Sequence, residues 1–189
     1  VLDMCLTQPA NLAEMGIGTM SVLVLPYIFT DYEQHWNVLT SEIGQELLDD
    51  VTNGGIQLRG FGYFMDGARN FFTVEGKPIR QLEDVKGLKL RVQDFDIDND
   101  MAIALGASAT PTATSEMYSG IVDGAEQPIA GYYGNKYYEV SSYFTLDEHT
   151  YNTPVVLFSE LSWANLSPEL QDVLTAAWEG ARDDSKQKI

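Results

Sequence analysis

Short apolar runs of strand type alternate with amphipathic helical patterns along almost the whole chain. We expect strands at residues 2–7, 21–25, 56–64, 71–74, 88–92, 121–123 and 155–159. We expect helices at residues 30–53, 79–85, 97–105, 115–119, 167–184 and, in part, 132–143. This alternation favours an α/β fold in which helices cover mainly parallel sheets. The length of 189 residues suits one large or two small domains.

Two of the helical patterns carry clear start signals. Thr30 and Glu33 form a capping box ahead of the first, in which each side chain can bond to the backbone of the other. Ser167 and Pro168 open the last pattern, with serine as the cap and proline at the first helical position.

The chain is strongly acidic, with 28 acidic residues, 11 basic residues and a formal net charge of −17. A nucleic-acid surface is not expected, because phosphate binding needs clustered Lys and Arg. No apolar run reaches the eighteen or so residues of a membrane helix, so the chain is not expected to be embedded in a membrane. An acidic protein can still bind an anion where positive charge is concentrated in one cleft.

Sequence motifs of catalysis are absent, and neither a catalytic residue nor a cofactor nor a bound metal is expected. Asp94, Asp96 and Asp98 are spaced like the start of a calcium loop. The sixth and twelfth loop positions would be Asn99 and Leu105 instead of glycine and an acid. Acidic residues at the start of a helix, favoured by the helix dipole, explain the pattern better.

The single cysteine and the two histidines give no motif. Cys5 is expected to be a small buried side chain, and His35 a partly exposed polar residue on a helix. His149 follows two acids, and a hydrogen-bonded structural role is expected for it. A Cys5–His149 pair is left open as a nucleophile and its base.

Arg91 ends the strand-type run GLKLRV, in which its neighbours are apolar. Ligands of open α/β sheets bind beyond the carboxyl ends of the strands. An arginine at that position offers a planar fork that suits a carboxylate. The alternative is an internal ion pair with one of the many acids, and both interpretations stay open from spacing alone.

A longer stretch around Arg91, residues 76–92 (GKPIRQLEDVKGLKLRV), resembles the solute-binding proteins of tripartite ATP-independent periplasmic (TRAP) transporters, the DctP family. Further similar motifs follow in order, among them LGA (105–107), TP (110–111), SEMY (115–118), VDGAEQP (122–128) and LSPE (166–169). The resemblance extends over essentially the whole chain.

The resemblance implies a two-domain α/β fold like that of type II periplasmic binding proteins, incomplete in this chain. One domain is expected to contain residues 1–66 and 153–189, and the other residues 67–152. Such a protein closes over a small organic acid in the periplasm and delivers it to a membrane permease, without catalysis. Family members begin and end with further segments, so this chain is expected to be a fragment without its signal peptide. The alternatives are a small-molecule enzyme or a ligand-sensing domain on the same scaffold.

The resemblance also implies the ligand-binding residues. Arg91 corresponds to the family arginine that pairs with the ligand carboxylate, and Arg69 to a second arginine near the cleft. Gln127 occupies a position where asparagine is common, and Gln93 and Thr114 complete the expected set. Thr114 stands where many members have an aromatic residue, and the helical segment before Gly120 is about one turn shorter than usual.

Overall fold

The computed structural model describes residues 2–186, and the chain forms two compact units. Unit 1 contains residues 1–24, 28–66 and 151–189, and unit 2 contains residues 25–27 and 67–150. The chain therefore passes from unit 1 to unit 2 and back twice. Residues 1 and 187–189, at the ends of the expected first domain, lie outside the described residues.

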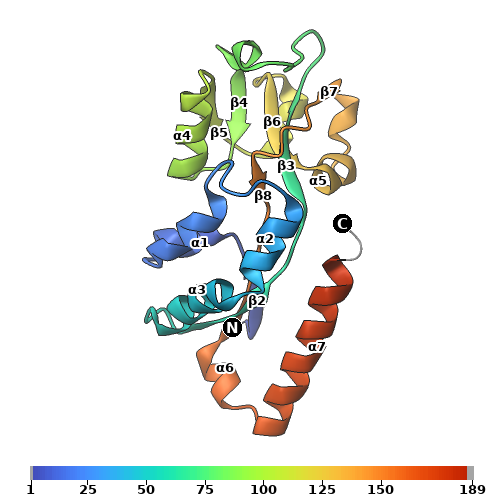
Figure 1. The fold of residues 1–189 in the computed structure, drawn as a ribbon. Coiled ribbons are helices and arrows are strands. Elements are labelled where there is room, and N and C mark those ends of the chain that lie inside the picture. Colours follow the sequence, from blue (N-terminus) through green and yellow to red (C-terminus); the bar gives the residue numbers. More distant parts are fainter. Residues whose placement is uncertain (1, 187–189) are drawn as a thin grey trace. The chain divides into compact units, whose positions relative to one another are not determined.

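Unit 1 is built on a three-stranded sheet in the order β1 (Met4–Thr7), β9 (Val155–Ser159), β2 (Leu58–Tyr63), of which β2 is labelled in Figure 1. Both strand pairs are antiparallel, so the expected parallel pairing is wrong for this sheet. The central strand β9 comes from the other end of the chain, and no strand–helix–strand crossover joins it to its neighbours. Nothing in the connections therefore requires parallel pairing.

Helices surround this sheet and contribute most of the core of unit 1. They are α1 (Pro9–Glu14), η1 (Gly18–Val24), α2 (Tyr32–Leu39), α3 (Glu42–Asn53), α6 (Glu160–Ala164) and α7 (Pro168–Lys186). Leu47, Leu48 and Val51 of α3 pack in one cluster with Leu157 of β9. Their spacing of three and four residues puts them on one helix face.

The expected strand at residues 21–25 is wrong, because residues 18–24 form the 3-10 helix η1. Met20 and Leu23 are its buried side chains. Residues three apart lie on the same side of a 3-10 helix, whereas a strand would bury alternate residues. An apolar run this short fits both patterns, and Pro26 behind it fits both as well.

The long helix expected at residues 30–53 is divided into α2 and α3. Asp31 caps α2 by accepting a hydrogen bond from the Gln34 N–H at 2.7 Å, so the expected capping by Thr30 is wrong by one residue. Thr40 ends α2, and Ser41 caps α3 by accepting from the Ile43 N–H at 3.2 Å. Hydroxyl side chains of this kind compete with helix continuation and favour caps.

Two further expectations in unit 1 are wrong. Cys5 is exposed, because its strand β1 presents most of its side chains to solvent. His35 is fully buried, lies 4.6 Å from the Phe29 ring and has its Nε2 2.8 Å from the Thr153 hydroxyl. Burial lowers the pKa of His35 to about 4, so the ring is neutral at pH 7.

Unit 2 contains a mixed sheet. Its strands are, in spatial order, β5 (Ser108–Pro111), β4 (Lys89–Val92), β6 (Gly124–Pro128), β3 (Ala68–Thr73) and β7 (Tyr143–Phe144), with β8 (Thr150–Tyr151) beside β3. β4 is parallel to β5 and β6, while β3 is antiparallel to β6 and β7. The expectation of mainly parallel sheets therefore holds only around β4.

The strand expected at residues 121–123 begins later, as β6 at Gly124. Its sequence GAEQP contains no residue with strong strand propensity, and pairing with strands on both sides decides its conformation. A Cβ atom at Gly124 would lie 2.5 Å from the Phe72 carbonyl oxygen, so the close approach of β6 to β3 requires glycine.

Two neighbouring side chains of β3, Phe71 and Phe72, pack into different hydrophobic clusters of unit 2. Phe71 packs with Leu90 of β4 and with Met101 of α4 (Asp96–Ala104). Phe72 packs on the other face with Ala125 and with Tyr137 of η4 (Tyr137–Glu139). The remaining helices are η2 (Leu82–Val85), η3 (Thr114–Ser119) and α5 (Ile129–Gly134). Successive residues of a strand point to opposite faces, so helices cover both faces of this sheet.

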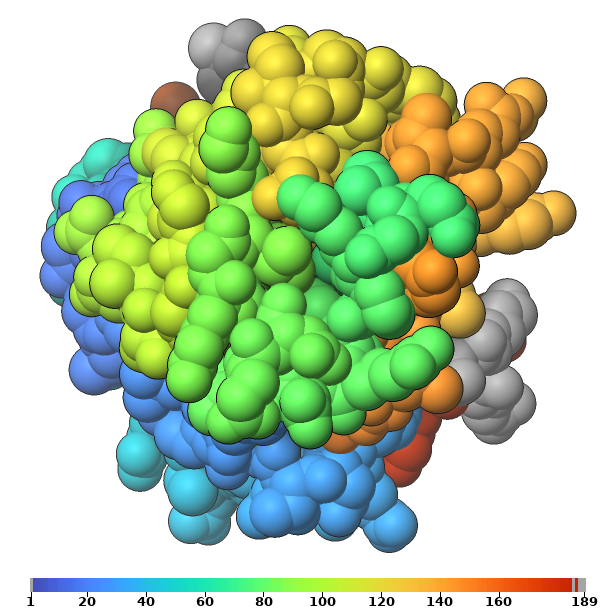
Figure 2. Space-filling model, turned by 90° about the horizontal axis from the view of Figure 1, so that it is seen from above, coloured from blue at the N-terminus to red at the C-terminus, as the bar shows by residue number. Residues whose placement is uncertain are grey.

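The connection from β3 to β4, residues 74–88, lies at the amino end of β4. Seen from above, its green residues lie between the yellow-green and orange parts of unit 2 (Figure 2). This connection occupies one end of the sheet, and Arg91 lies near the other end of β4.

Candidate functional site

Several polar side chains meet at one edge of the sheet of unit 2. β4, β5 and β6 are parallel, so their carboxyl ends lie at the same edge. β3 runs the other way, and its first residues lie at that edge because Arg69 is opposite Pro128 of β6. Arg91, which is opposite Thr110 of β5 and Ala125 of β6, therefore shares this edge with Arg69 and Gln127. We call it the strand-end site.

Arg91 is half-buried and has few polar contacts within the chain. Its Nε donates to the Thr112 carbonyl oxygen at 2.7 Å. Among residues 2–186 no carboxylate forms an ion pair with its guanidinium, so the alternative of an internal ion pair is wrong for Arg91. Burial lowers the pKa of Arg91, but an arginine remains charged in proteins. The site thus keeps a positive charge that no nearby carboxylate neutralises through an ion pair.

Arg69, in contrast, is paired within the protein. Its Nε and Nη2 both donate to the Glu126 carboxylate, the second at 2.6 Å from Oε1. Both side chains are buried, with 9% exposure for Arg69 and 1% for Glu126. Burial alone would raise the pKa of Glu126, but Arg69 and His149 outweigh burial and lower the pKa to about 2. The Glu126 carboxylate therefore neutralises most of the positive charge of Arg69, which was expected to bind the ligand.

His149 extends this buried pair, and its hydrogen-bonded structural role is confirmed. Its Nδ1 lies 2.7 Å from Asp147 Oδ2, and its Nε2 lies 3.5 Å from Glu126 Oε2, an ion-pair distance that is long for a hydrogen bond. The ring stacks on Phe71 with 4.5 Å between centroids. Asp147 also accepts from the Phe71 N–H at 2.9 Å. These contacts tie the start of β3 to β6 and to the segment before β8.

The charge of His149 makes a prediction about pH. Burial opposes protonation, but the carboxylates of Asp147 and Glu126 raise the pKa of His149 above its usual 6.5. A pKa that is higher in the folded than in the unfolded state gives stability that is complete below pH 6.5 and is lost as pH rises through the folded pKa. We expect the free energy of unfolding of the wild type to exceed that of His149→Gln by most below pH 6.5, and by less as pH rises through the folded pKa of His149. Urea titrations across this range test it, and a difference that grows with pH would contradict it.

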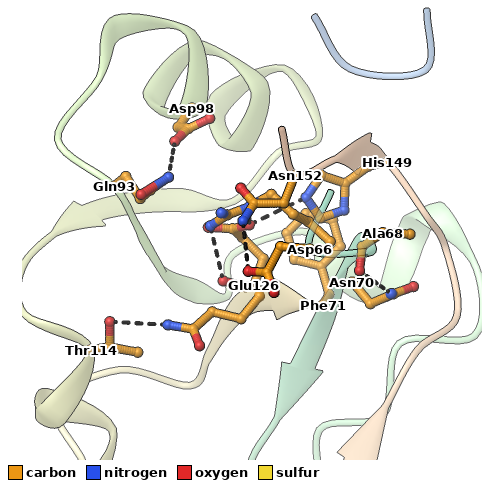
Figure 3. Close-up of polar contacts among 12 residues, drawn as sticks. Asp66, Ala68, Asn70, Phe71, Gln93, Asp98, Thr114, Glu126, His149 and Asn152 are labelled. Carbon is orange, nitrogen blue, oxygen red and sulfur yellow. Dashed lines mark hydrogen bonds and ion pairs between the residues drawn. The ribbon is translucent and has the colours of Figure 1, made fainter. Parts of the chain in front are cut away.

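The other expected ligand-binding residues lie in two polar pairs at the strand-end site (Figure 3). The Gln127 amide donates to the Thr114 hydroxyl at 3.3 Å. The Gln93 amide lies 3.5 Å from Asp98 Oδ2, at the outer limit of a hydrogen bond. Figure 3 shows Gln93 and Asp98 directed towards each other from the end of β4 and from α4. All four side chains are only partly buried.

Sequence reasoning did not assign Glu126, Asp147 or Asp98 to this site. An acid in the middle of a buried strand signals a buried partner, but β6 itself was not recognised, so Glu126 gave no signal. Asp98 was treated as one of several acids at a helix start. No three or more His, Cys, Asp or Glu side chains among the described residues are placed to hold a metal ion. None of the helices in residues 2–186 is long and apolar enough to cross a membrane.

Comparison with known proteins agrees with this architecture. The model of the bacterial extracellular solute-binding protein family 7, DctP, matches residues 1–189. A solute-binding protein of Chromohalobacter salexigens is 30% identical over 196 residues, which cover 95% of this chain and 57% of the relative. The C4-dicarboxylate-binding protein DctB of Bacillus subtilis is 33% identical over 160 residues, 82% of this chain and 45% of that protein.

A solved structure gives the same result for the fold. The TRAP periplasmic solute-binding protein of Xanthobacter autotrophicus Py2, with bound β-D-galacturonate, has a TM-score of 0.89 and 34% identity, covering 98% of this chain and 62% of that one. The chain belongs to the bacterial extracellular solute-binding protein family 7, which confirms the resemblance to TRAP solute-binding proteins and the expected fold class. It spans about half the length of the curated relatives that it matches.

Proposed function

We propose that this chain is part of the solute-binding protein of a TRAP transporter, which captures a small organic acid in the periplasm and delivers it to membrane permease subunits. The observation that carries the proposal is Arg91, a half-buried arginine at the carboxyl end of a strand without an ion pair among the described residues. A guanidinium in that setting binds a carboxylate through two parallel hydrogen bonds.

The surrounding residues support a binding role. Gln93, Gln127 and Thr114 supply uncharged donors and acceptors beside Arg91, which suits the hydroxyl or carbonyl groups of an organic acid. Arg69 was expected to bind the acid, and in the structure Glu126 accepts its hydrogen bonds. We assign Arg69 the task of holding the site edge rigid, with its charge adding only weakly to the attraction for an anion.

The proposal includes the division into two lobes, residues 1–66 with 153–189 and residues 67–152, that close over the acid. The two compact units support this division. Relatives named for, or solved with, a C4-dicarboxylate, sialic acid or galacturonate support an organic acid as the ligand. No side-chain pairing in the strand-end site favours an enzyme or a sensor over a transport protein.

A thermal-shift screen of the whole protein against organic acids tests the proposal. At one hundred times its Kd, a bound acid stabilises the folded state by about 2.7 kcal/mol, so the unfolding midpoint should rise clearly. D-Galactose is the matched neutral control for D-galacturonate and should give no shift. The acid should also be recovered unchanged after incubation. A panel in which only neutral or cationic solutes raise the midpoint would overturn the proposal, and turnover of the acid would favour an enzyme.

A further inference from the structure

Asp98 differs from the other acids at the start of α4. Asp94, Asp96 and Asp100 are exposed, as expected for acids that only complement a helix dipole. Asp98 is partly buried, and its carboxylate is directed towards Gln93 at the end of β4 (Figure 3). The helix dipole gives no reason for the Asp98 side chain to point into a polar site, where its carboxylate loses part of its hydration. A different reason for Asp98 is therefore needed.

The charges around Asp98 identify it as part of the strand-end site. Burial and the charge of Glu126 raise the pKa of Asp98, the charges of Arg69, His149 and Arg91 lower it, and the result is about 6. Its carboxylate is therefore mostly ionised at pH 7.5. Within residues 2–186 its one hydrogen-bond contact is the 3.5 Å approach of Gln93, which leaves an ionised carboxylate with acceptor capacity facing the site.

A charge balance of the site limits the ligand. Arg91 and Arg69 are positive and the raised pKa of His149 favours its positive form, while Asp98, Glu126 and Asp147 are negative, so these six residues carry no surplus of positive charge. Arg69 and His149 already have carboxylate partners, and Arg91 is the one cation among these three without an ion pair among the described residues. One ligand carboxylate can pair with Arg91. In the part of the strand-end site that the structure describes, a second carboxylate would meet no unpaired cation and would be repelled by Asp98.

We propose that Asp98 accepts a hydrogen bond from a hydroxyl group of the bound acid, and so selects hydroxylated monocarboxylates over dicarboxylates of the same length. This inference rests on the proposed function, because it requires an acid held by Arg91. An O–H donor towards an ionised carboxylate forms a short, strong hydrogen bond. A site that hydrogen-bonds a hydroxyl group also discriminates well against a ligand that lacks this group, since the Asp98 carboxylate then has no hydrogen-bond donor.

Two pairs of acids isolate this effect, because each pair differs only in whether the last carbon is an alcohol or a carboxylate. The pairs are D-galactonate with galactarate and D-erythronate with meso-tartrate. We expect the whole protein to bind the monocarboxylate of at least one pair at least about tenfold tighter than its dicarboxylate at pH 7.5. Isothermal titration calorimetry measures both affinities.

The Asp98→Asn variant removes the charge and keeps the size of the side chain. We expect it to weaken monocarboxylate binding, strengthen dicarboxylate binding and reduce their ratio to within about threefold. Asp96→Asn makes the same change at an exposed position of the same helix, and its ratio should equal that of the wild type. The thermal unfolding midpoint of each variant establishes that it is folded before the titration.

The possible outcomes separate this inference from the proposed function. If the wild type binds no organic acid, the proposed function itself is overturned. If the wild type binds the dicarboxylate as tightly as the monocarboxylate in both pairs, or binds only acids without hydroxyl groups, the role of Asp98 is overturned and the proposed function stands. The role of Asp98 is also overturned if a folded Asp98→Asn protein keeps the wild-type ratio.

Discussion

Replacing Arg91 by methionine in the whole protein should weaken the binding of its organic acid about thirty- to several-thousand-fold. This range corresponds to about 2–5 kcal/mol, the loss found when one partner of a buried charged pair is removed. Methionine keeps an unbranched apolar side chain without the charged guanidinium group. Calorimetric titration of both proteins with the same acid measures the change.

Two further variants define the cause of that loss. Arg91→Lys keeps the charge but not the planar fork, so its affinity should lie between those of the wild type and Arg91→Met. Arg80→Met removes an exposed arginine from the same unit and should leave the affinity unchanged. Arg91 makes one hydrogen bond and no ion pair within residues 2–186, so its variants should unfold at nearly the wild-type midpoint. An Arg91→Met affinity within about threefold of the wild type would contradict the role.

Replacing Glu126 by glutamine should reduce the free energy of unfolding by about 3–5 kcal/mol, because the variant leaves the Arg69 guanidinium buried without its carboxylate. The pair is enclosed, with 9% and 1% exposure, and His149 depends on the same carboxylate. Urea titration at pH 7 measures the loss. Glu83→Gln, an exposed position of η2, should change the free energy of unfolding by less than about 0.5 kcal/mol.

A double variant tests whether the loss comes from an unpaired charge. Arg69→Met combined with Glu126→Met removes both charges, and its cost should be smaller than the sum of the costs of Arg69→Met alone and Glu126→Met alone. A double-variant cost equal to the sum of the single costs would show that the pair does not stabilise this edge of the sheet. A Glu126→Gln cost below about 1 kcal/mol would show the same.

The sequence predicted best those features that depend on local pattern. The position of β4 and the place of Arg91 at its end follow from apolar alternation and from a rule about strand ends. The last helix follows from Ser167 and Pro168, which can be recognised without knowing what the helix packs against. Local signals of this kind do not depend on the rest of the fold.

The features that sequence analysis missed depend on contacts between distant segments. β6 has a sequence with weak strand propensity and forms a strand because β3 and β4 pair with it on both sides. Glu126 pairs with Arg69 at a sequence separation of 57 residues, and no helical or strand periodicity relates positions so far apart. Asp98 was indistinguishable in sequence from Asp96, and only burial and direction separate the two. The composition of the strand-end site therefore required the structure.

The most direct test is a crystal structure of the whole protein with a bound organic acid found by the thermal-shift screen. We expect a ligand carboxylate with its two oxygens about 3 Å from the Arg91 guanidinium nitrogens, while Glu126 remains bound to Arg69. A carboxylate held elsewhere, with Arg91 paired to a protein acid or turned to solvent, would contradict the central claim.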